Sequence, residues 1–275
     1  MNKYYDQNSR HWDNRARVHS SKSSDFYNIE EFLNGKSTLL PLEKSTLGNI
    51  KGKKILHAQC HIGFDTISLA RMGAEVTGVD FSLEAIRKAK EFAYHLQTQV
   101  TFIQSNIFDL PKTELPENSF DIVYASYGVL CWIDDLSKWT ATLSKYLKPG
   151  GMFLLIDDHP YVSTIELENN KYEIKYNYFK NPEPFEFIVE NSYTGEKFKL
   201  DVKKSYEWNH SIDEIIMSFL KSGLSITSFY EYDFNFWQRF PFLTKSSEGF
   251  YYKDSNKKNI PEYKIPLMFS LTATK

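Results

Sequence analysis

The sequence has few cysteines, no long apolar run and almost no net charge, and each shortage excludes a class of protein. Two cysteines in 275 residues do not suggest a disulfide framework. No apolar run approaches the ~20 residues that a helix needs to cross a bilayer, and residues 1–26 hold no apolar stretch of the signal-peptide type. A formal net charge of −2 argues against a nucleic-acid binder with a broad basic surface. We therefore expect a soluble, cytoplasmic protein without a nucleic-acid or membrane partner.

Aromatic side chains are abundant instead: the chain has 18 Tyr, 21 Phe and 5 Trp, many of them after residue 160. Its length fits one large domain, or one domain with a sizeable insertion. Residues 1–50 are polar with scattered aromatics, and we expect short helices and loops that pack onto the rest of the chain.

From residue 53 onward, short buried strands alternate with amphipathic helices. The pattern predicts strands at 55–58, 74–79, 100–104, 119–126 and 152–158, and helices at 65–72, 83–96 and 136–147. Ser82 is a plausible N-cap for the second helix, and Lys148-Pro149-Gly150-Gly151 is a stop-and-turn signal after the third. Such alternation is typical of an α/β fold, a parallel sheet covered by helices on both faces.

After His159 the pattern changes to alternating aromatic and polar residues, which predicts an antiparallel insertion over 160–210. A helix with Ser211 as its cap and Gly223 at its end follows. Two further strands, near 225–232 and 265–273, can complete the sheet as a hairpin.

Asp80 ends the second predicted strand, about 20 residues after the first strand–turn–helix. An acidic residue at this place can accept hydrogen bonds from ribose hydroxyls, in dinucleotide-binding proteins and in enzymes that use S-adenosylmethionine alike. A turn or cap residue is the alternative interpretation.

The first turn, Gln59-Cys60-His61-Ile62-Gly63, holds one glycine where a dinucleotide site needs several. Close approach to a diphosphate at the helix N-terminus is therefore disfavoured. A ligand that brings no phosphate to the turn demands less of it.

These segments, "ILHAQCHIGFDT", "GAEVTGVDFS" and "SFDIVYASYGVLCWIDDLSKWTATLSKYLKPGGMFLLIDDHP", resemble the class I S-adenosylmethionine-dependent methyltransferases. The likeness is greatest to a bacterial subgroup, of the methyltransferase type 11/25 kind, whose first motif contains Gln-Cys-His-x-Gly. It runs from about residue 10 to 160. It implies a Rossmann-like fold with a mostly parallel seven-stranded sheet, an antiparallel C-terminal strand and a β-rich insertion.

The resemblance also implies site residues. S-adenosylmethionine would contact the turn at Gln59, Cys60, His61 and Gly63, the second strand end at Asp80, Phe81 and Ser82, the adenine side at Asn106 and Ile107, and the fourth strand end at Ser126 and Tyr127. His57 stands where many members have an acid, so the partner of the methionine ammonium stays open.

The acceptor side is less defined. His159, just past the fifth strand, is the best-placed general base if one is needed, although it can equally satisfy a turn before Pro160. Trp132, Tyr127 and His159 are candidates for the acceptor pocket, with core packing as the alternative for Trp132. His57, Cys60 and His61 also have a spacing compatible with metal ligation, but no second cluster accompanies them, and we expect no metal.

We interpret the chain as a methyltransferase that moves a methyl group from S-adenosylmethionine to a small-molecule acceptor and releases S-adenosylhomocysteine. The expected domains are 1–50 as an N-terminal lid segment, 51–159 with 211–275 as the cofactor domain, and 160–210 as an insertion over the substrate pocket. A monomer or homodimer is expected. The alternatives are a nicotinamide-dependent oxidoreductase and a protein that binds S-adenosylmethionine without catalysis.

Overall fold

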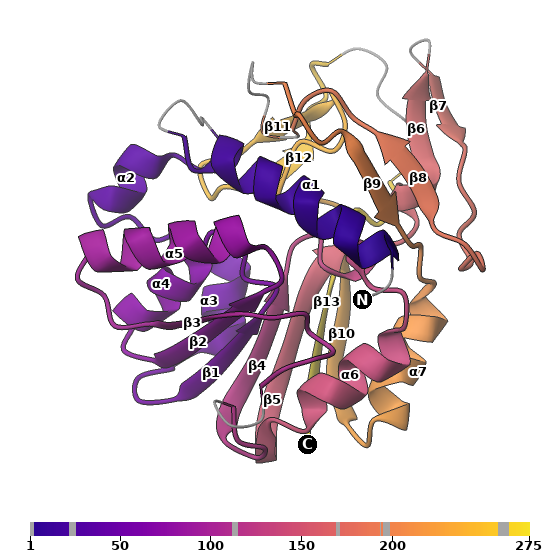
Figure 1. Cartoon of the computed structure of the whole chain (residues 1–275). Helices are drawn as coiled ribbons and strands as arrows, with labels where there is room; N and C mark the ends of the chain where they lie inside the picture. Colours follow the sequence, from indigo (N-terminus) through magenta and orange to yellow (C-terminus); the bar gives the residue numbers. More distant parts are fainter. Residues whose placement is uncertain are drawn as a thin grey trace.

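The computed structural model describes residues 3–21, 26–111, 115–168, 171–192, 194, 199–257 and 264–275. Among these residues, one seven-stranded sheet has the order β10-β13-β5-β4-β1-β2-β3 (Figure 1). Its strands are β1 (Lys54–Ala58), β2 (Glu75–Asp80), β3 (Thr101–Gln104), β4 (Phe120–Ser126), β5 (Leu147–Asp158), β10 (Ser225–Tyr232) and β13 (Met268–Thr274). Six strands run in the same direction, and β13 lies antiparallel between β5 and β10. The predicted Rossmann-like fold, a mostly parallel seven-stranded sheet with one antiparallel strand at the C-terminus, is thereby confirmed.

Helices cover both faces of this sheet. Leu56, Val123 and Leu155 point to the face that packs against α6 (Leu136–Ser144) and α7 (Ile212–Lys221). Ile55 and Leu154 point to the opposite face, which is covered by α3 (Pro41–Leu47), α4 (Phe64–Arg71) and α5 (Leu83–His95). Because both faces are buried, the central strands read as continuous apolar runs.

The predicted element ends need two corrections. The third helix of the alternating region ends at Ser144, not at 147, and the Lys148-Pro149-Gly150-Gly151 segment lies within β5. The backbone of this segment pairs with the end of the chain, since the Gly150 N–H donates to the Lys275 carbonyl at 2.8 Å. Ser211 does occupy the N-cap position of α7, but its hydroxyl donates to the Asp213 carboxylate instead of accepting from the helix backbone.

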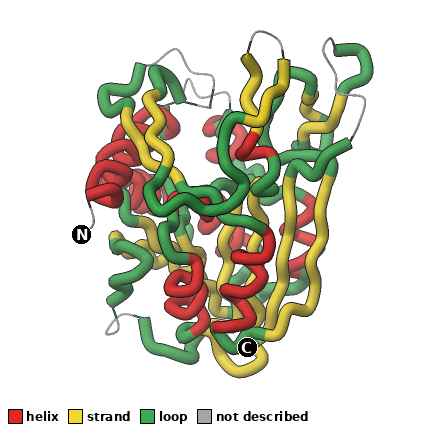
Figure 2. The backbone as a smooth tube through the Cα atoms, turned by 90° about the vertical axis from the view of Figure 1, so that its right-hand side faces the viewer, coloured by secondary structure: helices red, strands yellow, loops and turns green. Residues whose placement is uncertain are grey.

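A second layer lies over one end of the sheet, in the upper part of Figure 1. It contains α1 (Lys3–His19), α2 (Ile29–Leu33) and the antiparallel pairs β6 (Ile165–Glu168) with β7 (Lys171–Ile174), β8 (Phe185–Ile188) with β9 (Lys204–Glu207), and β11 (Leu243–Lys245) with β12 (Tyr251–Lys253). Two 3₁₀ turns, Leu130–Trp132 and Val162–Thr164, connect the layers. The tube view shows the short strand pairs in the upper half of the molecule, away from the C-terminus (Figure 2).

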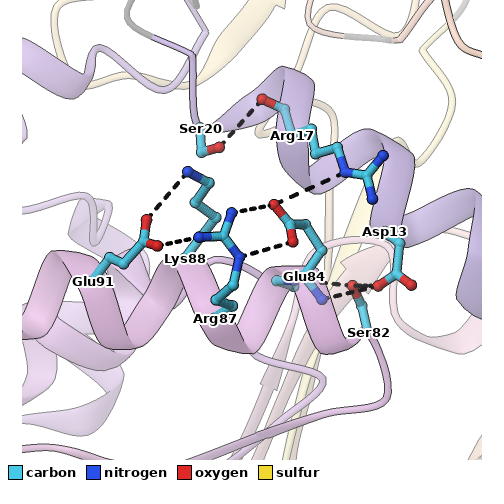
Figure 3. Close-up of polar contacts among 9 residues, drawn as sticks. Asp13, Arg17, Ser20, Ser82, Glu84, Arg87, Lys88 and Glu91 are labelled. Atoms are coloured by element: carbon cyan, nitrogen blue, oxygen red, sulfur yellow. Dashed lines mark hydrogen bonds and ion pairs between the residues drawn. The ribbon is translucent and has the colours of Figure 1, made fainter.

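Part of this layer was not expected from the sequence. The N-terminal segment was expected to form short helices, but α1 is 17 residues long. It docks across the start of α5, where Asp13 Oδ1 accepts hydrogen bonds from the Ser82 hydroxyl at 2.6 Å and from the Glu84 N–H at 3.0 Å (Figure 3). β11 and β12 were not predicted at all.

Candidate functional site

A cavity of about 1120 Å³ lies between the sheet and the second layer. Its floor is formed by the carboxyl ends of β1, β2, β4 and β5, the edge at which open α/β sheets bind ligands. Its cover comes from α1, from the β8–β9 pair and from residues 236–249. The volume is slightly larger than the range of about 300–1000 Å³ usual for small-molecule sites, which suits two ligands at once.

Most of the predicted site residues line this cavity: Gln59, Cys60, His61, Gly63, Asp80, Phe81, Asn106, Ile107, Ser126, Tyr127 and Trp132. The structure therefore brings together residues from four separate strand ends. Their roles toward a ligand stay predictions.

The first turn has backbone angles typical of a glycine-rich turn, although two of the positions concerned are not glycine. Gln59 and His61 have φ angles of +57° and +49°, in the left-handed region that favours glycine. Such residues cost about 1–3 kcal/mol each and persist where the surroundings hold them. Gln59 is held by its side chain, which donates to the Val129 carbonyl and accepts from Trp139 Nε1, both at 3.0 Å.

Gly63 serves packing inside the fold. With φ at +77°, it opens α4, and a Cβ at this position would lie 2.6 Å from Cζ of Phe102 and 2.8 Å from Cβ of Ala89. The single glycine of the turn is thus required where α4 meets α5 and β3.

Asp80 is buried at the end of β2 and tied to the turn. Its Oδ2 accepts from the His61 N–H at 2.8 Å and its Oδ1 accepts from the Ser82 N–H at 2.9 Å. Burial raises the pKa of the Asp80 carboxyl to about 6, against the lowering effect of these N–H donors. Each oxygen keeps a lone pair for a further donor from the cavity.

Two predicted residues do not line the cavity. Ser82 is fully buried and caps α5, since its Oγ accepts from the Ala85 N–H at 3.0 Å. His159 lies outside the described residues that line the cavity, and its Nε2 is 2.9 Å from Oε1 of Glu231 on β10. Its Nδ1 accepts from the Tyr161 N–H at 3.1 Å. Burial lowers the pKa of His159, and the Glu231 carboxylate partly offsets this. The geometry does not support the suggested roles of His159 as a base or acceptor residue.

The two acids before His159 differ in role. Asp157 holds the loop after β4, because its carboxylate accepts from the N–H groups of Val129 at 3.1 Å and Leu130 at 2.9 Å, and from that of Gly128. Burial raises its pKa to about 7. Asp158 faces the cavity and accepts from Asn235 Nδ2 at 2.7 Å and from Trp237 Nε1.

A chain of hydrogen bonds joins the first turn to the cover. His61 Nε2 lies 2.8 Å from His19 Nδ1 on α1, and His19 Nε2 lies 2.5 Å from Ser192 Oγ after β8. Burial lowers the pKa of His61 to about 3, helped by the charge of Arg15. It also lowers the pKa of His19, so both rings are neutral near pH 7.

The histidines of the His57, Cys60 and His61 group have separate hydrogen-bond partners. His57 Nδ1 is 2.8 Å from Thr66 Oγ1, whereas His61 Nε2 is 2.8 Å from His19 Nδ1. Across the described ranges, no three His, Cys, Asp or Glu side chains gather as metal ligands would.

Sequence reasoning missed several residues that cover the cavity: Trp12 of α1, Glu207 and Trp208 at the end of β9, and Trp237 and Arg239 before β11. Arg15 lies over the rings of Trp12 and Trp132, 5.1 and 5.8 Å from their centroids. The alternation of polar and aromatic residues could indicate strands in this region, but it does not show which side of a strand faces the cavity.

None of the helices in the described part of the chain combines the length and apolar character needed to traverse a bilayer.

The known proteins to which the chain is similar are methyltransferases. Residues 56–155 match the methyltransferase domain family. Over 107 residues the chain is 35% identical to phosphoethanolamine N-methyltransferase 3 of Arabidopsis thaliana, covering 38% of this chain and 21% of that protein. Over 121 residues it is 35% identical to an uncharacterised methyltransferase of Synechocystis sp., covering 44% of this chain and 53% of that protein.

The solved structures extend the likeness to the whole fold. An S-adenosylmethionine-dependent methyltransferase from Mesorhizobium loti superposes with a TM-score of 0.61 at 19% identity, covering 88% of this chain and all of that one. The chain spans from about a fifth to about half of the length of the curated relatives named above. The narrower likeness to the Gln-Cys-His-x-Gly subgroup stays a prediction.

Proposed function

Residues 56–155 form a domain of the class I, S-adenosylmethionine-dependent methyltransferases, and from this premise we propose that the chain transfers a methyl group from S-adenosylmethionine to a small-molecule acceptor. The observation that carries the proposal is the covered cavity, which joins the first turn, Asp80 and the end of β4 in one space. S-adenosylhomocysteine would be the second product.

The residues at the sheet edge fit the cofactor in kind and position. Asp80 would accept from the ribose hydroxyls, and Phe81 and Ile107 would pack on the adenine. Asn106 Oδ1 already accepts from the Phe108 N–H at 3.0 Å, so its second lone pair is what remains for the adenine amino group. Gln59, Cys60, His61 and Gly63 would face the methionine portion, with Ser126 and Tyr127 below the sulfonium.

The methionine ammonium requires a negative partner, and His57 cannot be one because an imidazole carries no negative charge; burial lowers its pKa to about 3, so it is neutral. Asp65, in the first turn of α4, lines the cavity next to the turn. One of its oxygens accepts from the Thr38 hydroxyl at 2.5 Å. We assign the ammonium to its carboxylate.

The bound cofactor supplies an electrophilic methyl group on a sulfonium. The chain's own contribution is to align the acceptor with that methyl group and to keep water out. We attribute the alignment and the exclusion of water to the cover of the cavity. In this cover α1 is hydrogen-bonded to β9: Asn8 Nδ2 donates to the Tyr206 carbonyl at 2.7 Å, and Asn8 Oδ1 accepts from the Tyr206 N–H at 2.8 Å.

We propose the domain arrangement in the same terms: residues 51–159 and 211–275 bind the cofactor, and residues 1–50 and 160–210 cover it. Residues 236–249 of the C-terminal part also contribute to the cover. A covered cavity admits a small acceptor more readily than a nucleic acid or a membrane surface. We place the protein in the cytoplasm, as a monomer or homodimer.

Methyl-tritiated S-adenosylmethionine and a cell extract depleted of macromolecules test the proposal. Label should move to a new small compound with the wild type and far less with Asp80→Asn. Label that enters protein or nucleic acid when complete extract is used would contradict a small acceptor. Binding of S-adenosylhomocysteine without any transfer would favour a non-catalytic binding protein, and a nicotinamide-dependent reaction would favour the oxidoreductase.

A further inference from the structure

The inner face of the β8–β9 pair carries one carboxylate among apolar side chains. Phe185, Phe187 and Val189 line the cavity. Glu207 is the cross-strand partner of Phe185, so its side chain lies on the same face, and it too lines the cavity. A carboxylate beside these apolar side chains is costly unless something compensates its charge.

Within the part of the chain that the structure describes, no hydrogen bond or ion pair compensates this carboxylate. The acids on the outer face of the same hairpin are paired, Glu186 with Lys204 at 3.0 Å and Glu190 with Lys203 at 2.7 Å. Glu207 has no hydrogen bond or ion pair with another described residue, in contrast to these two. Its free carboxylate therefore faces the cavity and whatever the cavity holds.

Glu207 also stands at the reacting end of the cavity. The N–H of the next residue, Trp208, donates to the Cys131 carbonyl at 2.8 Å. Cys131 belongs to the 3₁₀ turn that follows β4, the strand whose end is expected below the sulfonium. The charge of Glu207 contributes to raising the pKa of the Cys131 thiol, second to burial.

The surroundings of Glu207 suit an organic cation. Asp158 and Glu166 add negative charge from β5 and β6. The rings of Trp132 and Trp237 line the same space and already attract cations of the chain, since the guanidiniums of Arg15 and Arg239 lie 5.8 and 5.6 Å from their centroids.

The two positive groups nearby have other partners. Arg239 Nη2 donates to the carbonyls of Val162 and Ile165, both at 3.2 Å. The guanidinium of Arg15 lies over Trp12 and Trp132. Both attract Glu207 through space without forming an ion pair with it.

We propose that the acceptor is an amine, that its ammonium form binds Glu207 beside Asp158 and the tryptophan rings, and that Glu207 takes its proton. This rests on the proposed methyltransferase function. The ammonium N–H bond breaks and the proton passes to the carboxylate, leaving a neutral amine. The nitrogen lone pair then forms a carbon–nitrogen bond with the sulfonium methyl group while the carbon–sulfur bond breaks, with its electron pair left on sulfur. The methylated ammonium leaves, and the proton on Glu207 passes to solvent.

The electrostatics agree with this role. Burial raises the pKa of Glu207, Glu166 and Asp158 raise it further, and Arg15 and Arg239 lower it. A carboxylate whose pKa is raised toward neutrality is a better base than an ordinary one.

Matched ligands of one shape and different charge test the proposal by binding alone. The ligands are 2-phenylethylamine, 2-phenylethanol and 3-phenylpropanoate, and the corresponding amines, alcohols and acids with a cyclohexyl or indolyl ring. Their affinities would be measured by tryptophan fluorescence and ligand-observed NMR at pH 7.5, with and without S-adenosylhomocysteine. The amines should bind the wild type at least about tenfold more tightly than the alcohols or acids, consistent with a charge-assisted hydrogen bond. Glu207→Gln should remove the preference, and Glu186→Gln, on the outer face, should keep it.

The outcomes separate the two proposals. Equal binding of the three groups, tighter binding of the acids, a preference that survives Glu207→Gln, or no binding of any compound overturns the amine assignment. Calorimetry with S-adenosylhomocysteine on the same proteins reports the underlying function, since Glu207→Gln should still bind it. Failure of folded wild type to bind S-adenosylhomocysteine would overturn the methyltransferase proposal instead.

Discussion

The backbone N–H of His61 donates to Oδ2 of Asp80 at 2.8 Å, so the first turn and the end of β2 are held in one arrangement. In a glycine-rich turn the backbone reaches this position without strain, but here His61 reaches it at a φ of +49°. The Asp80 carboxylate therefore has two tasks: it holds a strained turn, and it offers its remaining lone pairs to the cavity. We therefore expect cofactor binding and the geometry of the turn to be coupled through this one side chain.

The first prediction concerns the pH dependence of binding. The pKa of Asp80 is raised to about 6 in the free protein, and ribose hydroxyls donate to the ionised form. Below pH 6 the carboxyl is protonated and binding must first remove that proton. The affinity for S-adenosylhomocysteine should therefore fall as the pH drops from 7.5 to 5, by calorimetry. Asp80→Asn should bind weakly with a flat profile over this range; an equally flat profile in the wild type would contradict the role of Asp80.

The second prediction isolates packing at Gly63. Gly63→Ala places a Cβ 2.6 Å from Phe102 at a φ of +77°, whereas Gly223→Ala meets nothing within 4 Å at a φ of +78°. Both variants lose folding stability because alanine disfavours a positive φ. Gly63→Ala should lose roughly 1–3 kcal/mol more, because its Cβ overpacks the contact with Phe102. Urea denaturation should show this difference between the two. Equal losses would mean that the contact with Phe102 relaxes freely.

The third prediction concerns Glu43, which is fully buried in α3 near Asp65 and Tyr127. Burial and the charge of Asp65 raise its pKa to about 8, above the ordinary 4.5. The folded state then resists ionisation of Glu43, so its presence costs stability increasingly as the pH rises from about 4.5 to 8. Glu43→Gln keeps the acceptor for the Leu40 N–H.

The stability gained by Glu43→Gln should therefore be larger at pH 8 than at pH 5, measured as the shift in Tm. Glu173→Gln on the exposed side of β7 is the matched control and should show no such trend. A gain that is the same at both pH values would mean that Glu43 titrates normally.

The fourth prediction concerns the anchor of the cover. Asp13 on α1 accepts from two donors at the start of α5, and loss of a capping acceptor typically costs about 1 kcal/mol. Asp13→Ala should speed hydrogen exchange of the α1 amides and raise the dissociation rate of S-adenosylhomocysteine. Arg10→Ala, exposed on the same helix, should change neither. Unchanged exchange in Asp13→Ala would show that other contacts hold α1.

The sheet could be predicted from the sequence because its strands and helices have clear hydrophobic periods, as in residues 83–96 with the Ser82 cap. The extent of α1 could not, because its buried face is largely polar: Asn8, His11, Asn14, Arg15 and His19 are buried there. A polar face that is satisfied by partners far along the chain leaves no apolar stripe to recognise.

The same reasoning explains the errors at the site. Neighbouring residues in extended chain point to opposite faces, so once Asp158 faces Trp237, His159 faces Glu231. The sequence placed both at the right strand end and could not tell which one turns inward. Glu207 is one of several glutamates in an alternating segment, and only its pairing with Phe185 shows that it faces the cavity.

Calorimetric titration of the wild type and of Asp80→Asn with S-adenosylhomocysteine, on protein freed of carried-over ligand and with NAD as the control, tests the central claim most directly. The account predicts micromolar or tighter binding by the wild type, a loss of about tenfold or more in Asp80→Asn, and no heat with NAD. Folded wild type that shows no binding of S-adenosylhomocysteine, or that binds NAD in its place, would contradict the account.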